Sequence, residues 1–219
     1  SPNPLYEAGK PSANGLTNIA EMGDNSVLGN YIGTQTGIFT PLSPVLVVVY
    51  NGIDNPIYKV GENDRGKGLK DLAQKGDATG LAAYLKTVSG VKAVYVLPAA
   101  STTILLPKIG GQSGSSVSQQ LNVAKGDRLA IATMYGLSND WFFASKDNGI
   151  DATAKGDVSA SIGLFDNGTA VNQFPGAGNS QAGLGGTPMA ENNPIGEVPN
   201  PNAFTTLPVI SNIVKVTIN

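Results

Sequence analysis

The 219-residue chain contains neither cysteine nor histidine. Without cysteine there are no disulfides, no thiolate catalysis and no zinc sites built from thiolates. Without histidine the most common general base is missing, and a Ser-His-Asp triad is excluded. The groups that remain for chemistry are carboxylates, lysines and hydroxyls, together with metal sites built from oxygen ligands, such as those of calcium.

Charge is also scarce. Charged residues make up 14% of the chain and the formal net charge is −2, whereas an ordinary soluble domain has about 25% charged residues. The lysines and arginines form no run, so we expect no nucleic-acid partner. The longest apolar run, Val45 to Tyr50, is far shorter than the roughly 20 residues of a membrane helix, so we expect no membrane span.

Hydrophobic residues make up 41% of the chain, which is enough for a globular core. Low charge together with abundant Gly, Asn, Thr and Ser favours a secreted or cell-surface protein, here of bacterial type. The chain begins at Ser1 without a signal peptide, from which we expect a processed form.

Strand patterns dominate the chain after residue 40. The apolar run Val45 to Tyr50 is typical of a central strand, and residues 158–164 and 214–218 alternate between apolar and polar. Further strands are expected over residues 91–97, 102–106, 117–123 and 127–135. Seven or more strands with polar turns predict an all-β fold, an antiparallel β-sandwich with one or two short helices.

Two stretches of the chain are similar to each other in sequence. Residues 4–24 and 56–77 share an aromatic segment, then Gly-Leu, Ala and Gly-Asp at nearly equal spacing. The second copy predicts a helix that ends at Gly76, and another short helix is expected over residues 80–87. The first copy lacks a preceding strand. We therefore divide the chain into a partial repeat or accessory segment at 1–35 and a sandwich domain at 36–219, which contains a long Pro/Gly-rich loop at 172–206.

Motifs between residues 124 and 176 carry a family resemblance. They are Ala-Lys-Gly-Asp-Arg-Leu at 124–129, Ser-Asn-Asp-Trp-Phe-Phe-Ala at 138–144 and Leu-Phe-Asp-Asn-Gly-Thr-Ala at 164–170. Upstream stand Leu-Ser-Pro at 42–44 and Gly-Leu-Lys-Asp-Leu-Ala at 68–73. In order and spacing, residues 36–219 resemble bacterial spondin-domain proteins, relatives of the amino-terminal domain of F-spondin.

The resemblance implies a sandwich similar to calcium/lipid-binding domains, with calcium bound in loops at one end. It implies roles in the extracellular matrix and in cell adhesion rather than catalysis. The family's three metal-ligand positions fall on Asp140, Asp166 and Ala170, and alanine offers no side-chain oxygen. We expect calcium on the two aspartates. Four other acids are candidates to replace the third ligand if their loops reach the site: Asp147, Asp151, Asp157 and Glu191.

The same residues have alternative interpretations. Asp140 is also suited to accepting backbone N–H bonds in its own turn, and Asn-Gly at 167–168 is a hairpin-turn signal by itself. The aromatic residues Trp141, Phe142 and Phe143 form either a ligand-facing cluster or a strand that is covered on both faces.

Three functions follow from these observations. The first is a non-enzymatic adhesion or matrix domain, because the sixteen acids select no catalytic pair and residues 61–66 lack the ending of a phosphate-binding loop. The second is a self-assembling subunit of an extracellular filament or sheet, a homo-oligomer in which the partial repeat pairs with a neighbour. The third is a carbohydrate-binding module, which requires an exposed aromatic side chain among Tyr50, Tyr58, Trp141 and Phe174.

Overall fold

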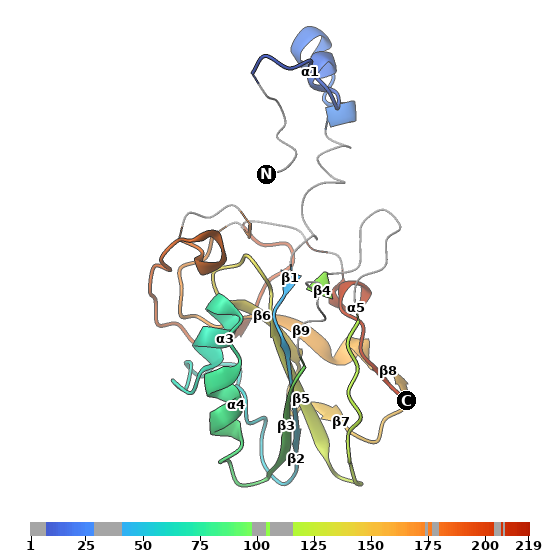
Figure 1. Cartoon of the computed structure of the whole chain (residues 1–219), viewed down its shortest axis with the longest axis vertical. Helices are drawn as coiled ribbons and strands as arrows, with labels where there is room; N and C mark the ends of the chain where they lie inside the picture. Colours follow the sequence, from blue (N-terminus) through green and yellow to red (C-terminus); the bar gives the residue numbers. More distant parts are fainter. Residues whose placement is uncertain are drawn as a thin grey trace.

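The computed structural model describes residues 8–28, 41–97, 104–105, 116–173, 175–176, 180–203, 207 and 209–219. A seven-stranded antiparallel sheet forms its centre, with the order β10-β9-β6-β5-β2-β3, and β7 pairs with β5 (Figure 1). Its strands are β2 (Val45–Tyr50), β3 (Val91–Leu97), β5 (Arg128–Met134), β6 (Trp141–Ser145), β7 (Ile150–Asp151), β9 (Ile162–Asp166) and β10 (Gly196–Glu197). The predicted all-β, antiparallel, sandwich-like fold is confirmed.

Two short helices cover one face of this sheet. They are α3 (Leu69–Lys75) and α4 (Thr79–Leu85), close to where helical spacing and glycine predicted them. Leu72 and Leu81 of these helices share a core cluster with Leu46 and Val48 of β2 and with Phe142 of β6. Strand β2 is central and buried on both faces, and for that reason its sequence is a continuous apolar run.

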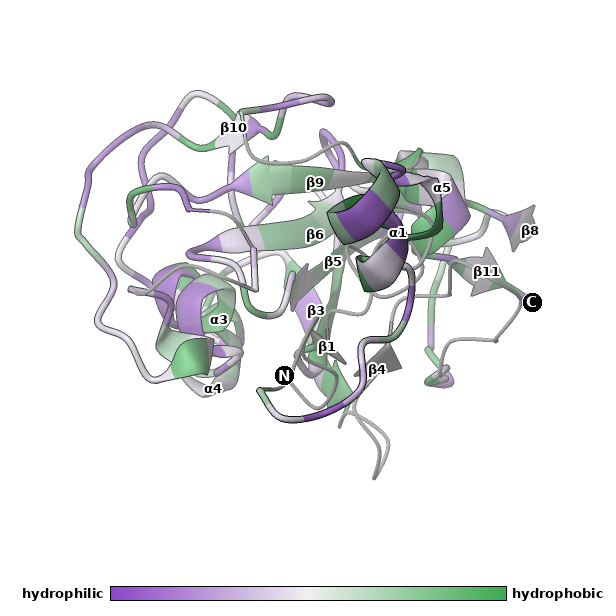
Figure 2. Ribbon diagram, turned by 90° about the horizontal axis from the view of Figure 1, so that it is seen from above, coloured by the Kyte–Doolittle hydropathy of each residue, from purple (hydrophilic) through white to green (hydrophobic). Residues whose placement is uncertain are grey.

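Shorter pieces cover the other face of the sheet (Figure 2). Strand β8 (Gly156–Asp157) pairs with β11 (Thr217–Ile218), and α5 (Ile210–Ile213) lies beside them. A second core cluster on this side includes Leu129, Phe143, Ile162 and Ile213. Strands β1 (Pro41–Leu42) and β4 (Ile104–Leu105) form a separate pair. The second layer is therefore assembled from short strands, a helix and irregular chain.

Several predicted strands differ from the structure. Residues 117–123 form no strand, and residues 159–161 form the 3-10 helix η1 (Ser159–Ser161), which leaves Ala160 exposed. The strand predicted over 158–164 therefore begins only at Ile162. At the end of the chain only Thr217–Ile218 is strand, although the predicted alternation of burial holds over 214–218. Of the strand predicted over 102–106, Ile104–Leu105 forms β4 and the rest lies outside the described residues.

The helices of the two similar stretches, 4–24 and 56–77, begin and end with the same backbone conformation. Helix α1 (Leu16–Met22) follows Gly15 at φ 88°, and α3 follows Gly68 at φ 102°. Both helices have seven residues and end at a glycine with positive φ. They differ in packing, because α3 buries four residues and α1 buries none. The division of the chain at residue 35 stays a prediction.

The Pro/Gly-rich segment at 172–206 is mostly loop where it is described. It contains the 3-10 helix η2 (Ala182–Leu184) and contributes the edge strand β10. In the described part of the chain, no helix is long and apolar enough to span a membrane, in line with the prediction.

Candidate metal centre

The register of two strands brings the predicted metal ligands together. Strands β6 and β9 are antiparallel, and Trp141, the first residue of β6, lies opposite Asp166, the last residue of β9. Asp140 directly precedes β6, and its carbonyl accepts a hydrogen bond from the backbone N–H of Asn167 at 3.2 Å. The turn before β6 and the turn after β9 therefore meet at one end of the sheet.

The carboxylate of Asp140 is fully buried and joins these two turns. Its Oδ2 accepts hydrogen bonds from the backbone N–H of Thr169 at 2.6 Å, from the Thr169 hydroxyl at 2.9 Å and from the backbone N–H of Ala170 at 2.9 Å. The alternative in which Asp140 accepts backbone N–H groups is thus realised, but with donors from the other turn. Asp140 therefore fixes the position of the loop after β9.

Asp166 is half-buried and is linked to Asp140 through amide side chains. Its Oδ1 accepts the backbone N–H of Gly168 at 2.8 Å, and its Oδ2 accepts Nδ2 of Asn172. The Oδ1 of Asn172 in turn accepts a hydrogen bond from Asn139 Nδ2 at 2.9 Å, and that same amide donates to Asp140 Oδ1. Two asparagines thus connect the two carboxylates.

The electrostatics of the pair disfavour two negative charges. Burial, followed by the charge of Asp166, raises the pKa of Asp140 to about 7, although hydrogen bonds from Thr169 and Ala170 oppose the shift. Within the described part of the chain, no lysine or arginine forms an ion pair with either aspartate. A bound cation would balance this charge.

Two buried amide oxygens at the site lack a donor. They are Oδ1 of Asn139 and Oδ1 of Asn167, and no described residue donates a hydrogen bond to either. The Nδ2 group of Asn167 donates to Asp64 Oδ2 at 3.0 Å and to the Thr169 hydroxyl at 3.2 Å, which fixes its orientation. An unsatisfied buried acceptor costs roughly 1–3 kcal/mol. Calcium prefers oxygen ligands, and the turns offer two carboxylates, whose oxygens already accept hydrogen bonds, and these two amide oxygens.

The position of Ala170 contributes only backbone groups. Its N–H donates to Asp140 and its carbonyl accepts Nδ2 of Asn139 at 2.9 Å, so no side-chain oxygen is present there. Within the described residues, no three acidic side chains lie close enough together to hold a metal ion. The fit to calcium therefore depends on the two aspartates and the neighbouring amides.

Glu191 is the candidate replacement ligand that lies beside the site. Its backbone N–H donates to the Thr169 carbonyl at 3.3 Å. Asp151 lies opposite Arg128, at the other end of β5, and its carboxylate accepts the backbone N–H of Thr153. Asp157, in β8, accepts the backbone N–H of Ser159. The carbonyl of Asp147 accepts a hydrogen bond from Asn55, also away from the β6–β9 turns.

Sequence reasoning identified the two aspartates but missed their asparagine neighbours. Asn139 and Asn167 stand in the quoted Asn-Asp and Asp-Asn-Gly motifs, and each directly adjoins a predicted ligand. That adjacency was the available signal. The two amides are candidate ligands because they are buried, and their burial depends on how the two turns pack.

The aromatic residues predicted as either ligand-facing or core belong to the core. Phe142 contacts Phe165 and Tyr58 on the helix side of the sheet, whereas Trp141 and Phe143 contact Tyr135 on the other side. All of these side chains are buried. The interpretation of a strand covered on both faces is therefore correct.

Comparison with known proteins adds no relative. No protein-family model matches the chain, and no curated protein matches it at a significant level. The resemblance to spondin domains stays a prediction from the quoted motifs.

Proposed function

We propose that this chain is a non-enzymatic, spondin-like domain of the bacterial cell surface or extracellular matrix, acting in adhesion or matrix organisation and stabilised by calcium. The observation that carries the calcium part is the pairing of two aspartates with two donorless, buried amide oxygens at one end of the sheet. The location and the adhesive role rest on the low charge and on the motif resemblance.

Calcium would act here as a structural link between two turns. Asp140 and Asp166 supply negative charge that offsets the ion, and Asn139 and Asn167 supply amide oxygens. The ion would connect the turn before β6 to the turn after β9, which Asp140 already joins through hydrogen bonds. Because the folded state alone presents this ligand set, binding would raise the free energy of unfolding.

A thermal melt in excess EDTA against millimolar calcium tests this function. Calcium at about 100 times its dissociation constant adds roughly 2.7 kcal/mol, which for this chain length raises Tm by about 5–10 °C. We expect Asp140→Asn and Asp166→Asn to lose the shift. Asp151→Asn, a matched change at the opposite end of β5, should keep it. An unchanged Tm in the parent protein would refute calcium binding.

The adhesive role needs its own measurement. Whole cells that display the chain, compared with cells that do not, should bind more strongly to extracellular matrix preparations, and EDTA should reduce the difference. Equal binding by the two kinds of cell would refute the role in adhesion.

One observation favours self-assembly as a second candidate function. Helix α1 and the residues after it expose Ile19, Met22 and Val27, with Met22 at 68% exposure, whereas the matching helix α3 is packed on the sheet. An apolar helix without cover favours burial against another chain. Sedimentation velocity at increasing concentration tests this, and a clean monomer at high concentration would refute it.

The structure offers no comparable support for carbohydrate binding. Tyr50, Tyr58 and Trp141 are almost fully buried, so none of them provides a stacking platform, and Phe174 lies outside the described residues.

A further inference from the structure

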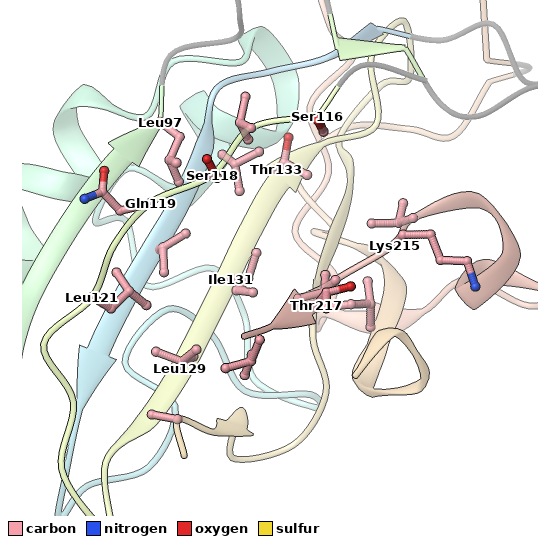
Figure 3. A pocket seen from close by; sticks show the side chains of 18 of the residues that line it. Leu97, Ser116, Ser118, Gln119, Leu121, Leu129, Ile131, Thr133, Lys215 and Thr217 are labelled. Carbon is pink, nitrogen blue, oxygen red and sulfur yellow. The ribbon is translucent and has the colours of Figure 1, made fainter. Parts of the chain in front are cut away.

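A cavity of about 900 Å³ opens between the sheet and the pieces that cover its second face (Figure 3). Its floor is formed by β2 and β5, one wall by residues 116–121 and another by residues 213–219. Figure 3 shows side chains from β5 and from residues 116–121 facing the same space. This volume lies within the range of small-molecule sites, about 300–1,000 Å³.

Within the described residues, the second layer covers this face of the sheet only in part. Residues 117–123 form no strand, and β8 and β11 have two residues each. As a result Val45 and Ile131, which belong to central strands, are only half-buried on this face. On the opposite face Leu46 and Val48 of the same sheet are fully buried under the helices. The sheet therefore retains apolar surface that a ligand could cover.

The lining is mostly apolar, and its charged side chains are two lysines; in Figure 3 the Lys215 side chain runs away from Ile131 and Leu121. Val47, Leu121 and Ile131 line the apolar part, and Lys155 and Lys215 line the cavity as well. No acidic side chain belongs to the described lining. Lys215 reaches Asp157 at 3.6 Å, whereas Lys155 forms no ion pair within the described residues.

We propose that this cavity binds a long-chain anionic amphiphile, of the chemical class of fatty acids. The apolar tail lies against Val47, Leu121 and Ile131, and the carboxylate lies toward Lys155, which has no ion pair within the described residues. Apolar tail burial supplies affinity, and this lysine selects a negatively charged head group. The cavity is separate from the metal centre, because neither Asp140 nor Asp166 lines it. The proposal is therefore independent of calcium.

The test uses cis-parinaric acid, a fluorescent fatty acid, titrated into the 219-residue chain below the critical micelle concentration of the probe. Trp141 is the single tryptophan and belongs to the core cluster that borders the cavity, so its emission should be quenched by energy transfer to bound probe. We expect saturable binding of one probe per chain, and displacement by unlabelled palmitate.

Two sets of variants locate the binding. Ile131→Phe narrows the cavity at its floor, where the tail lies, and should weaken binding at least tenfold, whereas Val60→Phe, at an exposed position outside the cavity, should leave it unchanged. Lys155→Ala should weaken binding of palmitate about tenfold but leave binding of the alcohol of equal length unchanged. Circular dichroism and Tm of each variant establish that it is folded.

Three results would overturn the proposal. They are the absence of saturable binding, equal binding by the folded Ile131→Phe variant, and equal loss of the acid and the alcohol in the lysine variant. A fourth would assign the cavity to another occupant. If probe binds only after the apolar side of α1 is charged by Ile19→Glu and Met22→Glu, then α1 fills the cavity and an amphiphile does not.

Discussion

The stability of this protein should fall as pH rises from 4 to 7 in the absence of calcium, and Asp140 should be the cause. Its carboxyl is fully buried beside Asp166, which raises its pKa from 3.8 to about 7. Between these two pH values the folded chain keeps a proton that the unfolded chain has released. The free energy of unfolding must then decrease with pH.

The magnitude follows from the two pKa values. A difference of about 3 between the folded and unfolded pKa corresponds to about 4 kcal/mol, since each tenfold change in an equilibrium is worth about 1.4 kcal/mol. This contribution is fully present below about pH 4 and is lost as pH rises through 7. Carboxyls whose pKa is lowered, such as Asp127 at about 2, act in the opposite direction and below pH 4. The window between pH 4 and 7 therefore reports on Asp140.

Asp140→Asn is the matched perturbation. It keeps the oxygen that accepts three hydrogen bonds and places an amide where Oδ1 meets Asn139. Asn139 Nδ2 also donates to the Ala170 carbonyl and to Asn172 Oδ1, so the Asn139 amide keeps its orientation and the new amide group faces a donor, which lowers the stability of the variant equally at every pH. The variant should fold, and its free energy of unfolding should lack the decrease of the parent protein between pH 4 and 7.

The assay is urea denaturation in EDTA at pH 4, 5, 6, 7 and 8, followed by circular dichroism. Millimolar calcium should restore the parent more at pH 8 than at pH 5, because the ion binds the ionised carboxylate. If the parent and Asp140→Asn curves run parallel across the whole range, Asp140 is ionised in the folded chain and the reasoning is wrong.

Two further predictions concern the fold. Gly68→Ala should destabilise by more than about 3 kcal/mol in urea titrations, because its φ is +102° and a Cβ would lie 2.4 Å from the backbone N of Leu81. The control Gly61→Ala has φ +85° and open space, so about 1–2 kcal/mol is expected, and equal losses would contradict the steric argument. Tyr58→Phe should cost about 1–2 kcal/mol, because the hydroxyl donates to the buried carbonyl of Ser145 at 2.9 Å; a neutral substitution would show that bond to be without net value.

Short sequence patterns correctly predicted the elements that depend on residues close together in the chain. The apolar run of β2 identified a central strand, because a strand buried on both faces has no polar side. Gly76 ends α3 as predicted, because only glycine enters the left-handed backbone region at low cost. The Asn-Asp-Trp and Asp-Asn-Gly motifs likewise identified the two turns that form the candidate metal centre.

The alternation of apolar and polar residues predicted strands less well where the backbone has no neighbouring strand to pair with. Residues 117–121 and Val123 line the cavity without forming a strand, and residues 159–161 form η1, although both segments carry strand-like sequence. A period of two reports which side chains are buried. It does not report whether a neighbouring chain satisfies the backbone hydrogen bonds, which depends on distant segments.

The sequence by itself determined that this protein has no thiol or imidazole chemistry, that its core is built from β-strands and that two short helices lie between β2 and β3. The tertiary structure decided that Asp140 and Asp166 meet, that the buried Oδ1 atoms of Asn139 and Asn167 receive no hydrogen bond from any described residue, and that the second face of the sheet borders an apolar cavity. The physical reason is that composition and local backbone preference act within a few residues. Register, burial and cavities arise from contacts between segments far apart along the chain.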